Sequence, residues 1–171
     1  IASLRPENTI IVGPTGNSVN GRPHSFTLAR FIGGSSFNIN SNLAELQANF
    51  VIPFSSYEMK DKVLIVDECF MVNPNHFIAL DNGLKKVMNT PAPFGGIQMV
   101  LVGDIYQLPA VNTKLGIYDT VAFKIAKFTT VVLNVQYRQT KDVAFQQLLA
   151  AMRSGKFDTN TEQMLDSINR R

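Results

Sequence analysis

Leu101-Val-Gly-Asp-Ile-Tyr-Gln-Leu108 and, upstream, Lys62-Val-Leu-Ile-Val-Asp-Glu68 are the two stretches that decide the fold of this chain. Each contains or follows an apolar run, residues 98–102 for the former and 63–66 for the latter, of the kind found in strands that are buried on both faces of a parallel sheet. The run at 63–66 is followed by Asp67 and Glu68, and the run at 98–102 by Asp104 and Gln107. Open α/β sheets bind their ligands at the edge where the carboxyl ends of parallel strands meet. The two stretches therefore predict a nucleotide-hydrolysing site at that edge.

The composition indicates an ordinary folded domain. The chain has 171 residues, of which 45% are hydrophobic, so it is long and apolar enough to bury a core. Its 16 Lys and Arg exceed its 13 Asp and Glu only slightly, and the net charge of +3 permits nucleic-acid binding without arguing for it. The single cysteine excludes a disulfide framework within the chain and favours a reducing, intracellular compartment. The first residues do not resemble a signal peptide, and without an initiator Met the chain is expected to be a piece of a longer one.

Strand and helix patterns alternate along the chain. We predict strands at residues 9–12, 62–67, 98–102 and 131–133. Asn73 and Pro74 are typical of a helix start, and apolar residues then recur at helical spacing at Phe77, Leu80, Leu84 and Val87. Asp142 is expected to cap a last helix whose inward-facing residues are Phe145, Leu148, Leu149 and Met152. This alternation predicts an α/β fold in a single domain, residues 1–171, with an open parallel sheet flanked by helices.

Asp67 and Glu68 have the chemistry of a phosphate-hydrolysing site. There, the first carboxylate holds Mg²⁺, often through water, and the second orients the attacking water or takes its proton. The alternative is that the pair caps a helix or faces solvent after a strand.

Two further side chains extend this site. The amide of Gln107 can contact a γ-phosphate on one side and a DNA-facing loop on the other, unless the segment is an ordinary turn ended by Pro109. Arg138, just beyond the predicted strand at 131–133, can bind a phosphate as a bidentate donor or can form a surface ion pair.

The N-terminal part carries a candidate nucleic-acid contact. Pro14-Thr15-Gly16 follows a strand, where backbone amides and hydroxyls can bind phosphates. In the nearby His24-Ser25-Phe26, the ring of His24 or Phe26 can stack on a base. The alternative is a Gly-Pro turn followed by a core phenylalanine. His76 is expected at the surface, and two histidines with one cysteine offer no metal-ligand cluster.

Taken in order, these residues resemble the superfamily 1 DNA helicases of the Pif type, close to the RecD group. The matching segments are residues 14–16, 20–21 and 24–26 (motif Ia), 64–68 with 71–72 (motif II, Walker B), 93–98 with 102–109 (motif III), and 137–139 with 145, 148 and 152–155 (motif IV). In that family this region is most of the first RecA-like domain, a P-loop NTPase fold. The family uses ATP and Mg²⁺ to move 5′ to 3′ on single-stranded DNA.

The resemblance implies a role for each site residue. Asp67 would bind Mg²⁺, Glu68 would be the catalytic base, Gln107 would sense the γ-phosphate and Arg138 would stabilise the transferring phosphate. Asp104 would lie in the nucleotide site. The implied DNA contacts are Thr15, Gly16, Asn20, His24, Ser25 and Phe26.

One part of the family's machinery is missing from this sequence. The first family motif is the Walker A P-loop, G-x-x-x-x-G-K-[ST], but the first Lys of this chain is Lys60 and the only Gly-Lys pair is Gly155-Lys156. The second RecA-like domain is also absent. We therefore expect a motor part that is completed by a P-loop segment and a second domain in the same or another chain. The alternative is a split or decayed module without ATPase activity that binds DNA or a protein.

Overall fold

The computed structural model describes residues 6–33, 41–133, 135 and 143–169. By its internal contacts the chain divides into two compact units, residues 1–128 and residues 129–171. The single domain that the sequence predicts over residues 1–171 stays a prediction.

The first unit is built on a four-stranded parallel sheet. Its strands are β1 (Thr9–Gly13), β2 (Ser25–Thr27), β3 (Val63–Val66) and β4 (Gln98–Leu101), in the order β2-β1-β3-β4. The predicted strands at 9–12, 62–67 and 98–102 are thus confirmed to within a residue or so at each end. Strand β2 was missed because three residues, Ser-Phe-Thr, are too short to show a pattern.

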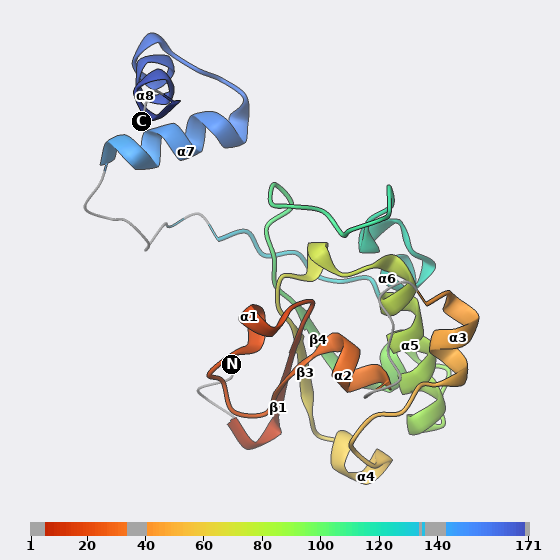
Figure 1. Cartoon of the computed structure of the whole chain (residues 1–171). Coiled ribbons are helices and arrows are strands. Elements are labelled where there is room, and N and C mark those ends of the chain that lie inside the picture. Colours follow the sequence, from red (N-terminus) through yellow and green to blue (C-terminus); the bar gives the residue numbers. More distant parts are fainter. Residues whose placement is uncertain (1–5, 34–40, 134, 136–142, 170–171) are drawn as a thin grey trace. The chain divides into compact units, whose positions relative to one another are not determined.

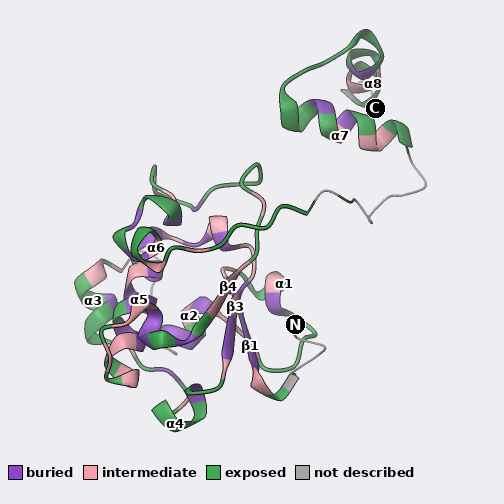
Figure 2. Cartoon of the chain, turned by 180° about the vertical axis from the view of Figure 1, so that it is seen from behind, coloured by how far each residue is buried: buried purple, intermediate pink, exposed green. Residues whose placement is uncertain are grey.

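Short helices lie between the strands and after the last of them. They are α1 (Gly16–Val19), α2 (Leu28–Gly33), α3 (Leu43–Ala48), α4 (Ser56–Met59) and α6 (Val121–Ala126). Single 3₁₀ turns lie at Pro6–Asn8, Cys69–Met71, Pro93–Gly96 and Ile117–Asp119. In both views of the molecule α2, α3 and α5 lie on the same side of the sheet (Figures 1 and 2).

Helix α5 (Pro74–Met88) is the main helix of the core. It begins as predicted, with Asn73 as N-cap and its side chain accepting a hydrogen bond from the N–H of Asn75 at 2.9 Å. Phe77, Leu80 and Leu84 are fully buried, as their spacing predicts, and they join the strand residues in one core, drawn purple in Figure 2. This packing fixes α5 against the sheet and so positions the loops at its ends.

The second unit contains α7 (Val143–Ser154) and α8 (Thr159–Asn169). Leu148 is buried as predicted, but Met152 is 55% exposed, so its predicted inward position is wrong. The predicted cap Asp142 lies outside the described residues. The strand predicted at residues 131–133 is also wrong. No strand is assigned to these residues in the described part of the second unit.

Across the ranges that the structure describes, no helix combines the length and the apolar character that crossing a bilayer would need. The sequence expectation for His76 is also wrong, since this residue is buried on α5 and not at the surface.

Candidate nucleotide and DNA site

The register of the sheet brings the predicted motifs to one edge. Val12 of β1 is level with Val66 of β3, which is level with Leu101 of β4. The N–H of Asp67 donates to the carbonyl of Val12 at 2.8 Å, and the N–H of Val102 donates to the carbonyl of Val66 at 2.9 Å. The segments after these strands, beginning at Pro14, Asp67 and Gly103, therefore leave the sheet side by side. The juxtaposition that the sequence predicts for Asp67, Glu68 and Asp104 is thus present at the level of the backbone.

Asp67 and Glu68 lie half-buried at the end of β3. One oxygen of Asp67, Oδ1, accepts a hydrogen bond from the N–H of Glu68 at 3.1 Å. Glu68 has the left-handed backbone conformation, with φ 50° and ψ 43°, which is uncommon outside glycine. The conformation is held by the next residue, because the N–H of the buried Cys69 donates to the carbonyl of Val102 at 2.9 Å. Strained backbone that is held in place in this way is concentrated at functional sites.

Asp104 and Gln107 form a tight turn after β4. Oδ1 of Asp104 accepts from the N–H of Tyr106 at 3.1 Å, and the carbonyl of Asp104 accepts from the N–H of Gln107 at 3.1 Å. The Gln107 side chain is exposed. Gly103 permits this turn, because a Cβ there would lie only 3.0–3.1 Å from the ring of Phe70 and from Cys69.

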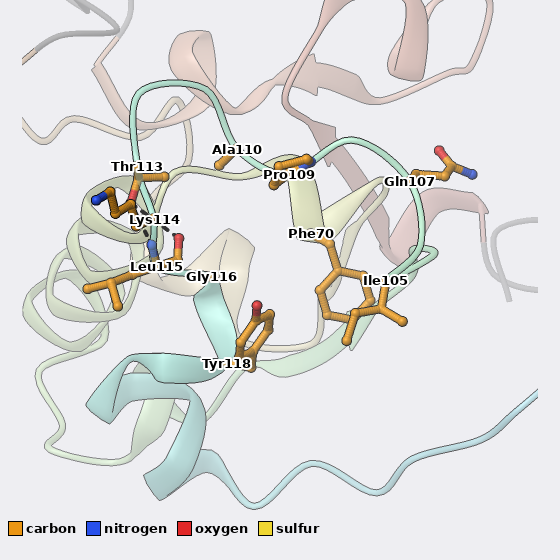
Figure 3. A pocket seen from close by; sticks show the side chains of 10 residues that line it. All are labelled: Phe70, Ile105, Gln107, Pro109, Ala110, Thr113, Lys114, Leu115, Gly116 and Tyr118. Atoms are coloured by element: carbon orange, nitrogen blue, oxygen red, sulfur yellow. Dashed lines mark hydrogen bonds between the residues drawn. The ribbon is translucent and has the colours of Figure 1, made fainter. Parts of the chain in front are cut away.

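A small pocket lies beneath this turn, lined by residues that include Phe70, Pro109, Lys114 and Tyr118. Figure 3 shows the Gln107 amide pointing away from the other lining side chains. The pocket volume is about 60 Å³, whereas sites for drug-sized ligands usually occupy roughly 300–1,000 Å³. A nucleotide does not fit there, so the exposed edge of the sheet is the better candidate site.

The predicted DNA-contacting turn begins with a compact motif. Thr15 is the N-cap of α1, and the Ser18 hydroxyl donates to the carbonyl of Thr15 at 2.7 Å. Gly13 is required here, because a Cβ on it would come within 2.2 Å of Ser18 Oγ. Gly16, by contrast, has open space around it. Thr15 and Gly16 are both exposed at the end of β1.

The rest of the turn is held by the Ser25 hydroxyl. This hydroxyl lies 2.6 Å from the carbonyl oxygens of both Val19 and Arg22, which share its one proton. His24 has a positive φ of 52° and an exposed side chain, and Asn20 is the exposed C-cap of α1. Ser25 is therefore occupied in positioning the turn, while Asn20 and His24 present side chains to solvent.

Phe26 has the environment of a core residue. Its ring is half-buried and lies 6.2 Å from the ring of Phe31 and 6.0 Å from the ring of Phe54, measured between centroids. This environment agrees with the alternative given above, in which Phe26 is a core phenylalanine. Base stacking by Phe26 stays a prediction.

Arg22 is the site residue that sequence reasoning missed. Its Nη1 lies 2.7 Å from Oδ2 of Asp67, in an ion pair that joins the motif Ia turn to the Walker B carboxylate. The sequence could have indicated it, because Arg22 lies between Gly21 and Pro23 in the turn that is predicted to contact DNA, and arginine is a common phosphate-binding residue.

Comparison with known proteins identifies the family. A family model described as PIF1-like helicase matches residues 31–163, which is more than half of the chain. This chain belongs to the PIF1-like helicase family. The RecA-like fold follows from the solved structures. The crystal structure of Pif1 helicase from Candida albicans superimposes with a TM-score of 0.74 at 28% identity, covering 94% of this chain and 38% of that one.

Two other PIF1-like relatives agree. The ATP-dependent DNA helicase PIF1 of Saccharomyces cerevisiae is 34% identical over 113 residues, 63% of this chain and 13% of that protein. Pif1 from Bacteroides in complex with ADP-AlF3 and ssDNA has a TM-score of 0.71 at 26% identity, covering 92% of this chain and 39% of that one. The chain thus spans less than half the length of each of these relatives.

The buried Cys69 and His76 of this PIF1-like chain are both uncharged at neutral pH. Burial raises the pKa of the Cys69 thiol to about 12, assisted by the nearby carboxylates of Glu68 and Asp67, so this thiol is not a nucleophile at neutral pH. Burial lowers the pKa of His76 to about 4, so its imidazole is neutral at pH 7.

Among the described residues no group of three or more His, Cys, Asp or Glu side chains gathers to hold a metal ion. Arg138 lies outside the described residues.

Proposed function

We propose that this chain is part of an ATP-dependent 5′ to 3′ DNA helicase motor, which couples ATP hydrolysis to movement on single-stranded DNA. The strand register gives the most direct support, because it aligns the ends of β1, β3 and β4 and so gathers motifs Ia, II and III at one edge. The family membership supports the same function, since the yeast relative is named as an ATP-dependent DNA helicase.

The carboxylate of Asp67 suits Mg²⁺ bound together with a nucleotide. Mg²⁺ prefers oxygen ligands and usually takes one or two protein carboxylates, with phosphates and water completing its shell. The half-buried Asp67 at the sheet edge can supply that carboxylate, and further protein ligands are not needed. When bound, the ion would neutralise charge that develops on the transferring phosphate.

The remaining residues receive distinct roles in this proposal. Glu68 orients the attacking water and accepts its proton, and its backbone N–H donates to Oδ1 of the neighbouring Asp67. Gln107 contacts the γ-phosphate from the turn after β4, and Asp104 shapes that turn through its hydrogen bond to Tyr106. Arg138 stabilises the phosphate in the transition state.

Single-stranded DNA is the proposed polymer partner, contacted by the turn from Thr15 to Phe26. The crystallised Bacteroides Pif1 holds ssDNA, and in this chain Thr15, Gly16, Asn20 and His24 are exposed on that turn. With a net charge of only +3, binding by this chain should be weak and sensitive to salt. Fluorescence anisotropy with a labelled oligothymidylate tests this. No binding even at low salt would contradict the proposed DNA site.

A P-loop segment and a second RecA-like domain are the proposed protein partners. Without phosphate-cradling amides and a Lys, the triphosphate has no anchor, and positioning with charge stabilisation supplies nearly all of this catalysis. We therefore expect no measurable ATP turnover by this chain alone with single-stranded DNA. Turnover on the order of 1 s⁻¹ or more, abolished by Glu68→Gln, would contradict this and reveal another phosphate loop.

The decisive experiment uses a complete protein that contains this sequence together with a P-loop. There, Glu68→Gln and Arg138→Ala should each lower ATP turnover by about a hundredfold or more while DNA affinity is largely kept, because both groups act on the transition state. A matching loss of DNA binding would contradict these roles. If no P-loop accompanies this sequence in its gene product, the non-catalytic binding module becomes the better description.

A further inference from the structure

Arg22 is held in a defined position by the turn that carries it. Gly21 before it has a φ of 75°, the carbonyl of Arg22 itself accepts the Ser25 hydroxyl at 2.6 Å, and His24 beyond it has a φ of 52°. In the sheet, β1 lies between β2, which this turn enters, and β3, which ends at Asp67. The ion pair therefore links the segments on either side of β1, 45 residues apart in sequence.

The ion pair uses one of the two oxygens that a metal ion can bind. Oδ1 of Asp67 already accepts the N–H of Glu68, whereas Oδ2 pairs with Arg22. A divalent cation that binds Asp67 therefore competes with the guanidinium of Arg22 for Oδ2. The Arg22 side chain is 49% exposed and the Asp67 side chain 18%, so the guanidinium can leave the pair toward solvent when a metal ion binds the carboxylate.

Once displaced, the guanidinium is a free cation on the turn proposed to contact DNA, between Asn20 and His24. Arginine matches phosphate geometry with several donors at once, so a DNA phosphate is its natural alternative partner. We infer that Arg22 is a phosphate-binding residue of the single-stranded DNA site, retained on Asp67 until a divalent cation takes Oδ2. This inference rests on the proposed function and adds a coupling between the metal site and the DNA site.

The inference predicts how DNA affinity responds when Asp67 is neutralised. In fluorescence anisotropy with a labelled oligothymidylate, without metal or nucleotide, Asp67→Asn should tighten binding by about three- to tenfold. One added phosphate contact should steepen the salt dependence by about 0.7 in log affinity per log salt. In an Arg22→Gln background the same substitution should give no such gain.

Asp61→Asn is the matched control. Asp61 is an exposed aspartate just before β3, at the opposite end of the strand from Asp67, and its neutralisation changes the net charge equally. It should produce the same small change with or without Arg22. A gain from Asp67→Asn that persists in Arg22→Gln, or that Asp61→Asn reproduces, overturns the inference.

A second measurement tests the competition without DNA. Paramagnetic Mn²⁺ added to ¹⁵N-labelled chain should broaden the amide signals near Asp67 and Glu68. The broadening should occur at several-fold lower Mn²⁺ in Arg22→Gln, at intermediate Mn²⁺ in Arg22→Lys, and not at all in Asp67→Asn. Identical titrations of wild type and Arg22→Gln overturn the inference.

The two proposals fail differently. A wild-type chain that binds no single-stranded DNA contradicts both the proposed DNA site and the phosphate role of Arg22. A wild-type chain that binds DNA, but shows no Arg22-dependent gain in Asp67→Asn, contradicts this inference alone. Thermal melts of all variants confirm that each comparison is made between folded proteins.

Discussion

His76 makes the stability of the fold depend on pH. Burial lowers its pKa to about 4 from an ordinary value near 6.5, so between these values the unfolded chain binds a proton that the folded chain does not. Stability should therefore fall as pH decreases from about 6.5 to about 4, by up to roughly 3 kcal/mol. Urea unfolding at several pH values measures this. His76→Gln, which has no titrating group, should lose most of that dependence, and an unchanged dependence would assign it to other groups.

Phe26 is a residue whose role in packing can be separated from a role in binding. Because its half-buried ring packs against Phe31 and Phe54, Phe26→Ala should cost about 2–3 kcal/mol and lower the melting temperature by roughly 4–12 °C. Phe26→Leu keeps most of the apolar volume but removes the aromatic face. If the ring only packs, Phe26→Leu should bind single-stranded DNA like the wild type. A loss of roughly 1–3 kcal/mol in DNA affinity by this folded variant would instead establish base stacking.

At the scale of elements, the turn at Pro93–Gly96 is fastened to α5 by one carboxylate. Oδ1 of the buried Asp81 accepts from the N–H of Phe94 at 2.7 Å, and Oδ2 pairs with Nζ of Lys85 at 2.6 Å. Phe94 and Gly95 both have positive φ, and a Cβ on Gly95 would approach the carbonyl oxygen of Leu84 to 2.6 Å. The turn therefore depends on glycine and on Asp81 for its close contact with the helix.

Substitution of Asp81 tests this fastening. Asp81→Ala leaves the buried N–H of Phe94 without its acceptor and should cost about 2–4 kcal/mol in urea unfolding. Asp81→Asn keeps a carbonyl oxygen for that N–H and should cost clearly less. Lys85→Met removes the cation but leaves the hydrogen bond from Phe94 to the Asp81 carboxylate, so it should cost less than Asp81→Ala. Equal losses for Asp81→Ala and Lys85→Met would show that the ion pair, and not the hydrogen bond to Phe94, secures the turn.

The elements also show what the sequence could predict and why. Helix α5 was predictable because its apolar residues recur at helical spacing after a recognisable cap. Strands β1, β3 and β4 were predictable because they are continuous apolar runs followed by turn or polar residues. Strand β2 and the contact between Arg22 and Asp67 were not, since both arise from segments brought together only by the sheet order. The apolar residues 131–133 read as a strand, but pairing is a property of two segments and cannot be inferred from one.

At the scale of the whole molecule, β4 is as apolar as a strand in the interior of a sheet, but it lies at the edge of the described sheet. Within the described residues it pairs only with β3, and its apolar Met99, Val100 and Leu101 are only half-buried. The next residue, Val102, is 44% exposed. An uncharged outer strand of this kind presents unpaired backbone groups that invite another strand. This edge is where we propose that the partner carrying the P-loop strand completes the sheet.

Without such a partner the chain should associate with itself. Sedimentation at micromolar concentration should show species heavier than the monomer. Val102→Lys places a charge beside the open edge and should shift the chain toward monomer, because charged side chains on an outer strand oppose strand pairing. Val121→Lys is the control, since Val121 is similarly exposed but lies at the start of α6, and it should leave association unchanged. A wild-type chain that stays monomeric, or a Val121→Lys variant that dissociates equally well, would show that β4 is not the surface through which a partner joins.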